Sequence, residues 1–488
     1  MSDTQPFAAV VLVGAVVGLL AVLSARLTER IRVPAPLLVL VGAAVAVEVV
    51  PALRSPSERL VERLVTVALI CILFNGGLQM GWSKFRVAAA PITVLGVLGT
   101  FLTVAAVATF VHLVFVIAWF PALLVATAVS PTDPAIVFSV LAHREVTGRS
   151  GTILEGESGA NDPVGIALMA SLITAGGLSA GAFGSIAGQF VLQMVVGAAV
   201  GVLGGRATLW FMRSVPLPGE GLYPLRTAAC ALIVFGLATL AHGSGFLAVF
   251  IAGILLGDAR APYKLEIERF HAALASLGEI VAFTMLGLTV DLPRLTHVDV
   301  WLPGVVTGAV LAFVIRPVVA GVCLLPARLR ANERTFVIFA GLKGAVPILL
   351  GTFILAADGH DAERLYAMVV VVVVFSVLVQ GSLVPTVANL LRLPMETVAP
   401  EPWAVGVRLR DEPQGVHRLT IAAGAPADGR RINELHALPE DAWISLVVRD
   451  NRLVPVRGDA LLRAGDEVLV LADPASLETV EATFRRAG

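Results

Sequence analysis

The sequence is poor in charged residues and in cysteine. Of its 488 residues, 15% are charged and 57% are hydrophobic, and the mean hydropathy is +0.87. This composition is too apolar for a soluble globular domain. The three cysteines stand alone in apolar runs, which excludes a disulfide framework and a cysteine-based metal site. The net charge is −1 and no cluster of Lys and Arg is present, so no nucleic acid strand is expected as a partner.

The few charges are unevenly distributed along the chain. Residues 1–392 hold 45 charged side chains, whereas the much shorter stretch 393–488 holds 26. Such a change in density is typical of a boundary between a membrane part and a soluble part. We therefore expect a membrane domain over residues 1–392, a linker over 393–404 and a small α/β domain over 405–488.

Apolar runs of spanning length recur throughout the membrane domain. A transmembrane helix needs about 20 apolar residues, and 13 runs separated by Gly, Pro or charged breaks come close to that length. The sequence therefore predicts an all-α polytopic membrane protein with about 13 transmembrane helices. The runs fall near residues 7–25, 33–50, 60–79, 87–111, 117–141, 151–175, 184–212, 224–241, 244–258, 271–291, 300–325, 334–357 and 363–391.

The distribution of Lys and Arg predicts the orientation of these helices. With the N-terminus outside, the inner loops hold 16 Lys and Arg residues and the outer loops hold 5. The first run is preceded by Asp3 and followed by Arg26, which is not the charge pattern of a cleavable signal. We expect this run to remain as the first span, with membrane lipid around the helices. The predicted location is the cell membrane, with the C-terminal domain in the cytoplasm.

Two of the predicted spans are interrupted. Pro131-Thr132-Asp133-Pro134 lies within the run 117–141, where prolines remove helical donors and restrict the residues before them. Gly341–Pro347 lies within the run 334–357. Broken backbone at membrane depth is tolerated only when it lines a cavity or is buried in protein. Matching breaks seven spans apart predict inverted repeats, with two discontinuous helices that cross at a binding site.

A pair of carboxylates lies inside the run 151–175. Glu157 and Asp162 belong to the segment Gly-Glu-Ser-Gly-Ala-Asn-Asp-Pro, and each carboxylate costs roughly 2.5–3.5 kcal/mol to insert in a membrane. Ser158 and Asp162 are four residues apart and share one helix face, whereas Glu157 and Asn161 share another. We predict that Asp162 faces the first break, where Ser158 and Thr132 add neutral oxygens around a monovalent cation.

The remaining charges of the membrane domain are expected to form pairs. We predict that Glu157 pairs with Lys343 and that Arg316 pairs with Asp133, which leaves Asp162 unpaired. Because burial disfavours the charged carboxylate, a proton and a cation would compete for Asp162. One cation per proton would make the exchange electroneutral. The alternative is that Asp162 is a structural or helix-capping acid.

Three motifs resemble those of the monovalent cation:proton antiporters. They are residues 156–163, Thr132–Pro134 and Gly341–Pro347, and the Asn-Asp pair at the end of the first resembles the NhaP-type branch. The resemblance covers residues 7–391. It implies a homodimer of thirteen-helix subunits, in which a core domain moves in an elevator-like way. It further implies an ion site at Asp162, Ser158, Thr132 and Asp133 (through its backbone), with Asn161 and the Glu157–Lys343 pair organising the helices.

The sequence departs from the family pattern at two positions. Asn75 stands before Gly76 and Gly77, where the family often carries an acidic residue. Lys343 stands where this branch frequently has arginine, and lysine lacks the bidentate fork of a guanidinium group. Both departures concern ion selectivity and the pairing of charges at the site.

The C-terminal domain has its own pattern. Arg418–Ala422, Trp443–Val448 and Glu467–Leu471 are typical of strands, and Pro474–Phe484 is typical of a closing helix. Together with the stretch 455–466, these segments resemble the TrkA-type C-terminal (RCK-C) regulatory domain. The resemblance implies dimerisation and a small regulatory ligand, of nucleotide type. The alternative is a dimerisation module that binds no ligand.

These observations favour a transporter over an enzyme. The RCK-C resemblance favours potassium/proton exchange, with sodium/proton exchange by the same mechanism as the alternative. The substrates would be K⁺ or Na⁺ and H⁺, with no covalent cofactor. A gated potassium channel is less favoured because the sequence lacks a Thr-Val-Gly-Tyr-Gly filter and a channel does not need a buried titratable group such as Asp162. A non-transporting sensor would not need two broken helices. No phosphate-binding loop suggests an ATP-driven pump.

Overall fold

The computed structural model separates the chain into two compact units, Met1–Pro400 and Glu401–Gly488. The first is built from helices and the second is a small mixed domain. The structure describes residues 18–19, 23, 35–49, 57–141, 144–146, 149–259, 261–327, 329–356, 361–393, 395–397, 415–435, 438–439, 442–449, 452–473 and 476–485.

The helices of the first unit follow one another with short connections. This confirms the predicted fold class of a helical membrane protein with a small strand-containing domain. In chain order they are α2 (Ala35–Val49), α3 (Glu58–Thr93), α4 (Thr100–Phe115), α5 (Trp119–Val129), α6 (Pro134–Leu141), α7 (Arg149–Ala175), α8 (Ala180–Ser214), α9 (Leu222–Leu240), α10 (Gly245–Gly257), α11 (Lys264–Leu288), α12 (Leu292–Leu295), α13 (Val298–Val310), α14 (Arg316–Cys323), α15 (Ala331–Phe339), α16 (Ala345–Ala356), α17 (Ala362–Phe375) and α18 (Ser382–Leu390).

Several of these helices are long and apolar enough to cross a membrane. Within the described residues, 6 continuous helical stretches meet that test, and α5 with α6 forms a seventh span that bends by 41° at its break. The stretch Arg59–Phe115 is counted once, although α3 changes direction at Gly81, whose φ is 59°. Residues 7–25, the first predicted span, lie almost wholly outside the described residues. The protein is a multi-pass membrane protein, and the number of thirteen spans stays a prediction.

Glycines allow α3 and α10 to pack closely. Gly77 and Gly81 on α3 face Gly253 and Gly257 on α10, and a Cβ atom on Gly257 would lie 2.5 Å from the Cα of Gly81. A Cβ on Gly253 would lie 2.6 Å from the carbonyl oxygen of Phe74. Such spacings of four are a common contact between membrane helices, because small residues let the two backbones approach.

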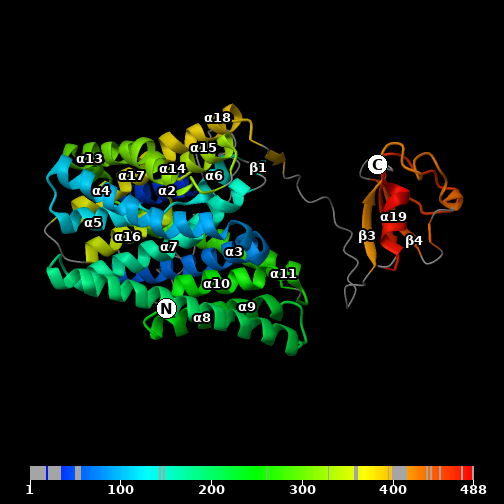
Figure 1. Ribbon diagram of the computed structural model, residues 1–488, viewed down its shortest axis with the longest axis horizontal. Coiled ribbons are helices and arrows are strands. Elements are labelled where there is room, and N and C mark those ends of the chain that lie inside the picture. The colour runs from blue at the N-terminus through cyan, green and yellow to red at the C-terminus, as the bar shows by residue number, and fades with distance from the viewer. Residues whose placement is uncertain are drawn as a thin grey trace. The chain divides into compact units, whose positions relative to one another are not determined.

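Helix α7 lies in the middle of the first unit, between α8 and α9 along one border and α13 and α14 along the other (Figure 1). It packs against α3, α5, α8, α15 and α16. Asp162 occupies the middle of this 27-residue helix, so its surroundings come from several spans that are distant in sequence.

In the part of the chain that the structure describes, three spans contain π-helical turns. These are η2 (Val94–Gly99), η3 (Leu311–Ile315) and η4 (Ser376–Gly381), and each is continuous with an α-helix on both sides. A π-turn adds a residue to the helix and shifts the face that the following side chains present, and it is frequent at functional sites. Segment η3 leads directly into Arg316, and η4 carries Ser376 and Gln380.

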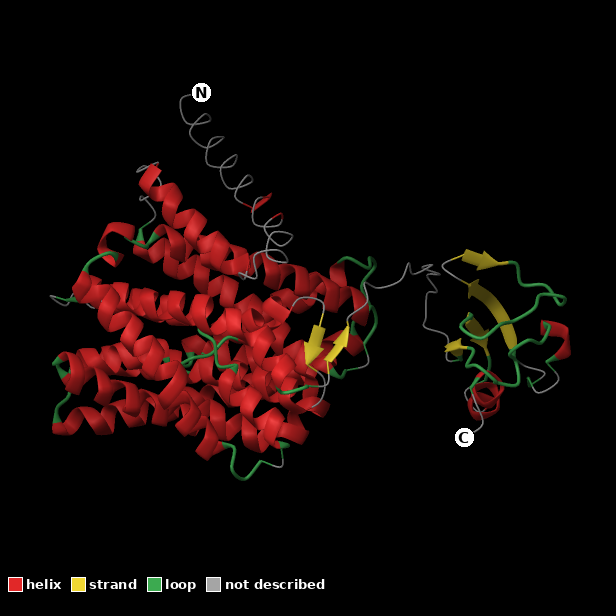
Figure 2. Cartoon of the chain, turned by 90° about the horizontal axis from the view of Figure 1, so that it is seen from above, coloured by secondary structure: helices red, strands yellow, loops and turns green. Residues whose placement is uncertain are grey.

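A small antiparallel pair of strands lies beside the helices in the first unit (Figure 2). Strand β1 (Arg144–Val146), in the connection between α6 and α7, pairs with β2 (Met395–Thr397), which follows α18. The chain is therefore tied to the α6–α7 connection before it leaves the first unit.

In its described residues, the second unit is a four-stranded antiparallel sheet covered by one helix. The strands β3 (Val416–Thr420), β4 (Trp443–Arg449), β5 (Arg452–Val454) and β6 (Glu467–Leu471) lie in the order β3-β6-β4-β5. Helix α19 (Leu477–Phe484) contributes its buried Val480 and Phe484 to the core. The predicted strands are present: the ends of the last strand coincide with those of β6, and the other ends differ by at most two residues.

Candidate functional site

The two interrupted helices meet at their breaks. The first break separates α5 from α6 and the second separates α15 from α16. The backbone N–H of Asp133, in the first, donates to the carbonyl oxygen of Leu342, in the second, over 2.8 Å. The interruptions predicted from proline and glycine are therefore present, and the two discontinuous helices cross each other.

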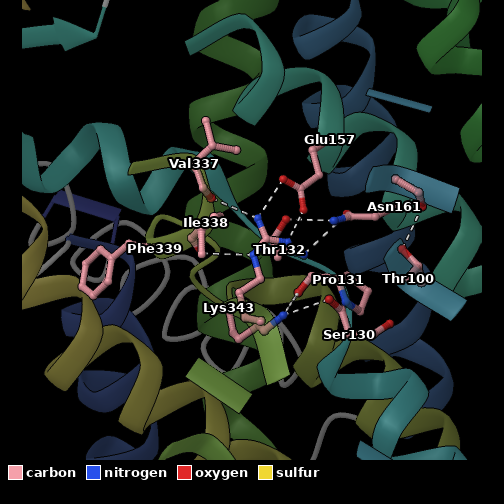
Figure 3. A network of polar contacts seen from close by, with 12 residues as sticks. Thr100, Ser130, Pro131, Thr132, Glu157, Asn161, Val337, Ile338, Phe339 and Lys343 are labelled. Atoms are coloured by element: carbon pink, nitrogen blue, oxygen red, sulfur yellow. Dashed lines mark hydrogen bonds and ion pairs between the residues drawn. The ribbon is translucent and has the colours of Figure 1, made fainter. Parts of the chain in front are cut away.

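Lys343 neutralises the end of α5. Its Nζ donates to the carbonyl oxygens of Ser130 and Pro131 (Figure 3), at 2.8 and 3.1 Å. The residue is only 3% exposed. The end of a helix has carbonyls without a partner and carries partial negative charge. The ammonium group satisfies the carbonyl of the C-cap residue Ser130 and that of Pro131 just beyond it, and is itself solvated by these protein oxygens.

Glu157 forms a bidentate ion pair with Arg316, in contrast to our prediction. The guanidinium Nη2 donates to Glu157 Oε2 over 2.9 Å, and Nη1 donates to Oε1. Arg316 also donates to the carbonyl oxygens of Val337 and Ile338, at the end of α15. The predicted Glu157–Lys343 pair is wrong. A planar fork matches the two oxygens of a carboxylate, whereas the ammonium group of Lys343 suits converging carbonyls.

Asp133 lies at two helix N-termini, so its predicted pairing with Arg316 is also wrong. Its Oδ1 accepts a hydrogen bond of 2.9 Å from the backbone of Ala135, in the first turn of α6. Its Oδ2 lies against Gly344, immediately before α16, where a Cβ atom would come within 1.8 Å of it. Helix N-termini carry partial positive charge and exposed N–H groups, so they stabilise a carboxylate without a cationic side chain.

Asp162 is the carboxylate of the site with the fewest partners. It is 7% exposed, and its Oδ2 accepts one long hydrogen bond, of 3.5 Å, from Ser158. Its Oδ1 is buried and has no hydrogen-bond partner among the described residues. Its charge interacts with those of Asp133 and Lys343. The shared face of Ser158 and Asp162 is as predicted.

Asn161 ties α7 to the first break. Its Nδ2 donates to Thr132 Oγ1 over 2.8 Å, and its Oδ1 accepts from the backbone N–H of Thr132 over 3.4 Å (Figure 3). This pair of bonds fixes the position of the neutral Thr132 hydroxyl. Next to it, Pro131 packs against Gly165 of α7, where a Cβ atom would lie 2.7 Å from the proline ring.

Three polar residues of this region were not predicted as site residues from the sequence. Ser376 and Gln380 of η4 contact the second break, as described below. Glu279 of α11 is partly buried, and its charge interacts with that of Asp133. The sequence suggested a position near the inner interface for Glu279, whereas this carboxylate lies in the second half of the 25-residue helix α11. Asn75 is partly buried on α3, and its side chain makes no hydrogen bond within the described part of the chain.

The chain matches the family described as "Sodium/hydrogen exchanger, transmembrane" over residues 15–390 and the TrkA-C domain over residues 416–485. It therefore belongs to the sodium/hydrogen exchanger family and carries a TrkA-C domain, as the motifs of the sequence predicted.

Individual relatives agree with this family. The chain is 33% identical over 425 residues to the K(+)/H(+) antiporter NhaP of Alkalimonas amylolytica, and the aligned region covers 86% of this chain and 73% of that relative. It is 30% identical over 486 residues to the K(+)/H(+) antiporter NhaP2 of Shewanella oneidensis, covering 98% and 83%. The structure of the sodium proton antiporter MjNhaP1 from Methanocaldococcus jannaschii superposes with a TM-score of 0.67 at 21% identity, covering 79% of this chain and 98% of that one. This last likeness concerns the fold.

Proposed function

We propose that this protein is a secondary active antiporter that exchanges potassium for protons by alternating access. The observation that carries the proposal is the state of Asp162. It is buried at the crossing of two broken helices, and one of its oxygens has no hydrogen-bond partner among the described residues. A carboxylate in that position needs either a proton or a cation, because an unpartnered buried charge is costly.

The other charges of the site are already neutralised in place. Arg316 is paired with Glu157, Lys343 binds the end of α5, and Asp133 lies at two helix N-termini. None of these groups needs a mobile ion for its own stabilisation. The exchange therefore depends on Asp162, with Ser158, Thr132 and the backbone at Asp133 as further oxygen donors.

The exchange follows from competition at one carboxylate. When Asp162 holds a proton or a potassium ion it is close to neutral, and the loaded core can change the side to which it opens. When Asp162 is empty it is charged, and its passage through the low-dielectric barrier is disfavoured. One proton is then exchanged for one cation, and the cycle is electroneutral. Current recordings from reconstituted protein test this stoichiometry, since a net current would contradict it.

We favour potassium over sodium as the exchanged cation because the similar proteins named above are K(+)/H(+) antiporters and because the chain carries a TrkA-C domain. Sodium/proton exchange at the same site is the second candidate, favoured by the name of the family and by the similar fold of a sodium proton antiporter. The described oxygens around Asp162 are hard ligands that suit either ion.

We also propose an orientation in the membrane, a dimer and a role for the TrkA-C domain. The excess of Lys and Arg in alternate loops supports an outer N-terminus and a cytoplasmic TrkA-C domain. Helix α8 exposes large apolar side chains such as Phe183, Val195 and Trp210, which suits contact with lipid and with the second subunit of a homodimer. The TrkA-C domain regulates exchange by binding a small ligand of nucleotide type. Removing residues 400–488 should change this regulation and leave exchange in place.

The decisive experiment measures proton movement in proteoliposomes that contain a pH dye. Adding K⁺ or Na⁺ at several pH values to the wild type should release protons, with the larger signal for K⁺. The variant Asp162→Asn should show none, because the amide cannot exchange a proton for a cation. Cation-driven proton movement that survives this substitution unchanged would refute the assignment of Asp162.

A further inference from the structure

Two polar side chains in the last span are buried although no step of the proposed exchange uses them. Ser376 is 3% exposed and Gln380 is 1% exposed. Both lie on the π-helical segment η4, which separates α17 from α18. Polar groups at that depth are retained only when hydrogen bonds satisfy them, so their partners indicate their role.

The partners of this pair lie on the two sides of the second break. Gln380 Nε2 donates to the carbonyl oxygen of Phe339, the last residue of α15, over 2.5 Å. Ser376 Oγ donates to Gln380 Oε1 over 3.1 Å. The same Oγ accepts from the backbone N–H of Lys343, just before α16, over 3.2 Å. Gln380 and Ser376 therefore hold the gap between α15 and α16 from both edges.

Side chains from two neighbouring spans cap the C-terminal end of α15. Arg316, which follows η3, binds the carbonyls of Val337 and Ile338, and Gln380 of η4 binds that of Phe339. A cavity with about 10 Å³ of room for the centre of a water molecule lies between Arg316, Lys343 and Gln380. That is near the lower limit for one water and too small for a hydrated ion.

We propose that Gln380, acting through Ser376, is a positioning residue that keeps Lys343 at the end of α5 and close to Asp162. The proposal rests on the proposed function of Asp162. The backbone of Lys343 is fixed by Ser376, and from there its Nζ reaches the carbonyls of Ser130 and Pro131. Without Gln380, the gap between α15 and α16 is free to widen, and the ammonium group moves away from its carbonyls.

A displaced Lys343 has a predictable effect on the first break. Its Nζ binds the carbonyl oxygens of Ser130 and Pro131, which directly precede Thr132, one of the proposed oxygen ligands of the cation. From the other side, Asn161 of α7 binds Thr132. If the ammonium group moves away, the break loses two of its contacts, the Thr132 hydroxyl is held less firmly, and the cation is bound less tightly.

The test compares the apparent KM for K⁺ and the maximal rate of exchange for the full-length wild type, Gln380→Met and Ser376→Ala in proteoliposomes. Methionine keeps the length of the side chain and removes its hydrogen bonds. We expect Gln380→Met to raise the apparent KM about three- to tenfold, which corresponds to roughly 0.7–1.4 kcal/mol, with a smaller change in the maximal rate. Ser376→Ala should raise the KM in the same direction. The double variant should raise it by less than the two effects combined, because the two residues act as a unit.

Val372→Ala is the matched control. Val372 lines the same cavity and is buried, but it is an apolar residue, so its truncation should lower the melting temperature without changing the apparent KM for K⁺. A folded Gln380→Met protein whose apparent KM equals that of the wild type overturns the proposal, even if its maximal rate is lower. Should Gln380→Met not fold, the apparent KM of Ser376→Ala decides in the same way. Absence of exchange in the wild type would instead contradict the proposed function itself.

Discussion

Two buried carboxylates, one in each unit of the chain, differ in the number and length of the hydrogen bonds that they accept. Asp466 in the TrkA-C domain is 1% exposed and accepts hydrogen bonds from Arg449 Nε and Nη2 at 2.8 and 2.7 Å and from the backbone of Arg463 at 2.8 Å. Asp162 in the membrane unit is 7% exposed and receives one bond of 3.5 Å, from Ser158. Asp466 is saturated with donors, as a structural acid is, whereas Asp162 has unused capacity, which ion exchange in the proposed function requires.

Glu157 and Asp133 extend this comparison within the membrane unit. Glu157 is saturated by a guanidinium group, and Asp133 is held by the ends of two helices. If these surroundings reflect the role of each acid, disturbing Glu157, Asp133 or Asp466 should lower the stability of the protein, whereas substituting Asp162 should not. Four substitutions test this contrast, from the largest expected effect to the smallest.

Arg316→Met should have the largest effect on stability. It leaves Glu157 buried without a counter-charge, which typically costs about 3–5 kcal/mol. We expect a large fall in the melting temperature of the purified protein in detergent, or failure to fold. The double variant Glu157→Met/Arg316→Met should recover much of that loss, because it removes both buried charges. If the double variant instead lost more stability than Arg316→Met alone, the loss of the ion pair would not be the cause of the destabilisation.

Gly344→Ala should damage the position of Asp133. The new Cβ atom would come within 1.8 Å of Asp133 Oδ2, and forced overpacking typically costs about 1–3 kcal/mol. Exchange should fall together with the melting temperature, because the crossing of the broken helices is displaced. Gly76→Ala is the matched control, since no atom lies within 4 Å of its added Cβ. Equal effects of the two substitutions would contradict the close contact.

Asp466→Asn should destabilise the TrkA-C domain alone, by about 1–3 kcal/mol, because charge-assisted bonds from Arg449 are lost. Burial acts to raise the pKa of Asp466, but the hydrogen bonds from Arg449 and Arg463 outweigh it and hold the pKa below its ordinary value of 3.8. A carboxyl group with a lowered pKa stabilises the folded state above its ordinary pKa, and this contribution is lost as the pH falls through the lowered value.

Limited proteolysis of the full-length protein measures this effect. In the wild type, cleavage within residues 416–485 should increase as the pH falls below 3.8, whereas Asp466→Asn should be cleaved more readily at neutral pH and change less on acidification. Exchange in proteoliposomes should continue in the variant. Cleavage that is the same in both proteins at neutral pH would mean that Asp466 does not stabilise the domain.

Asp162→Asn should cost the least stability while abolishing exchange. The substitution removes a buried charge that has one weak hydrogen bond, so the melting temperature should stay unchanged or rise. Comparison with Asp466→Asn, the same change of side chain, isolates the effect of the surroundings. A fall in melting temperature as large as that of Arg316→Met would show that Asp162 is a structural acid.

The sequence predicted those parts of the site that depend on local rules. The break at Pro131–Pro134 follows from the missing donors of proline, and the shared face of Ser158 and Asp162 follows from the period of the helix. The partners of the buried charges were predicted wrongly because they lie far apart in the chain. Glu157 and Arg316 are 159 residues apart, and the π-turn of η3 just before Arg316 changes the face that it presents.

Gln380 could not be predicted for a related reason. A glutamine in an apolar span gives no periodic signal, and its role depends on a π-turn and on the gap in another span. The predicted strands of the TrkA-C domain were placed to within one or two residues, since alternation and turn residues act locally. Long-range pairing in the membrane unit has no comparable signal in a single sequence.

The pairing of β1 with β2 has a mechanical consequence. The chain that leads to the TrkA-C domain does not leave the first unit freely after α18, because Met395–Thr397 is hydrogen-bonded to the connection between α6 and α7. Tension on that segment would act first on α6 and α7, and α7 carries Asp162. In the proposed function, a ligand of the TrkA-C domain that changed this tension would therefore act directly on the helices beside the site.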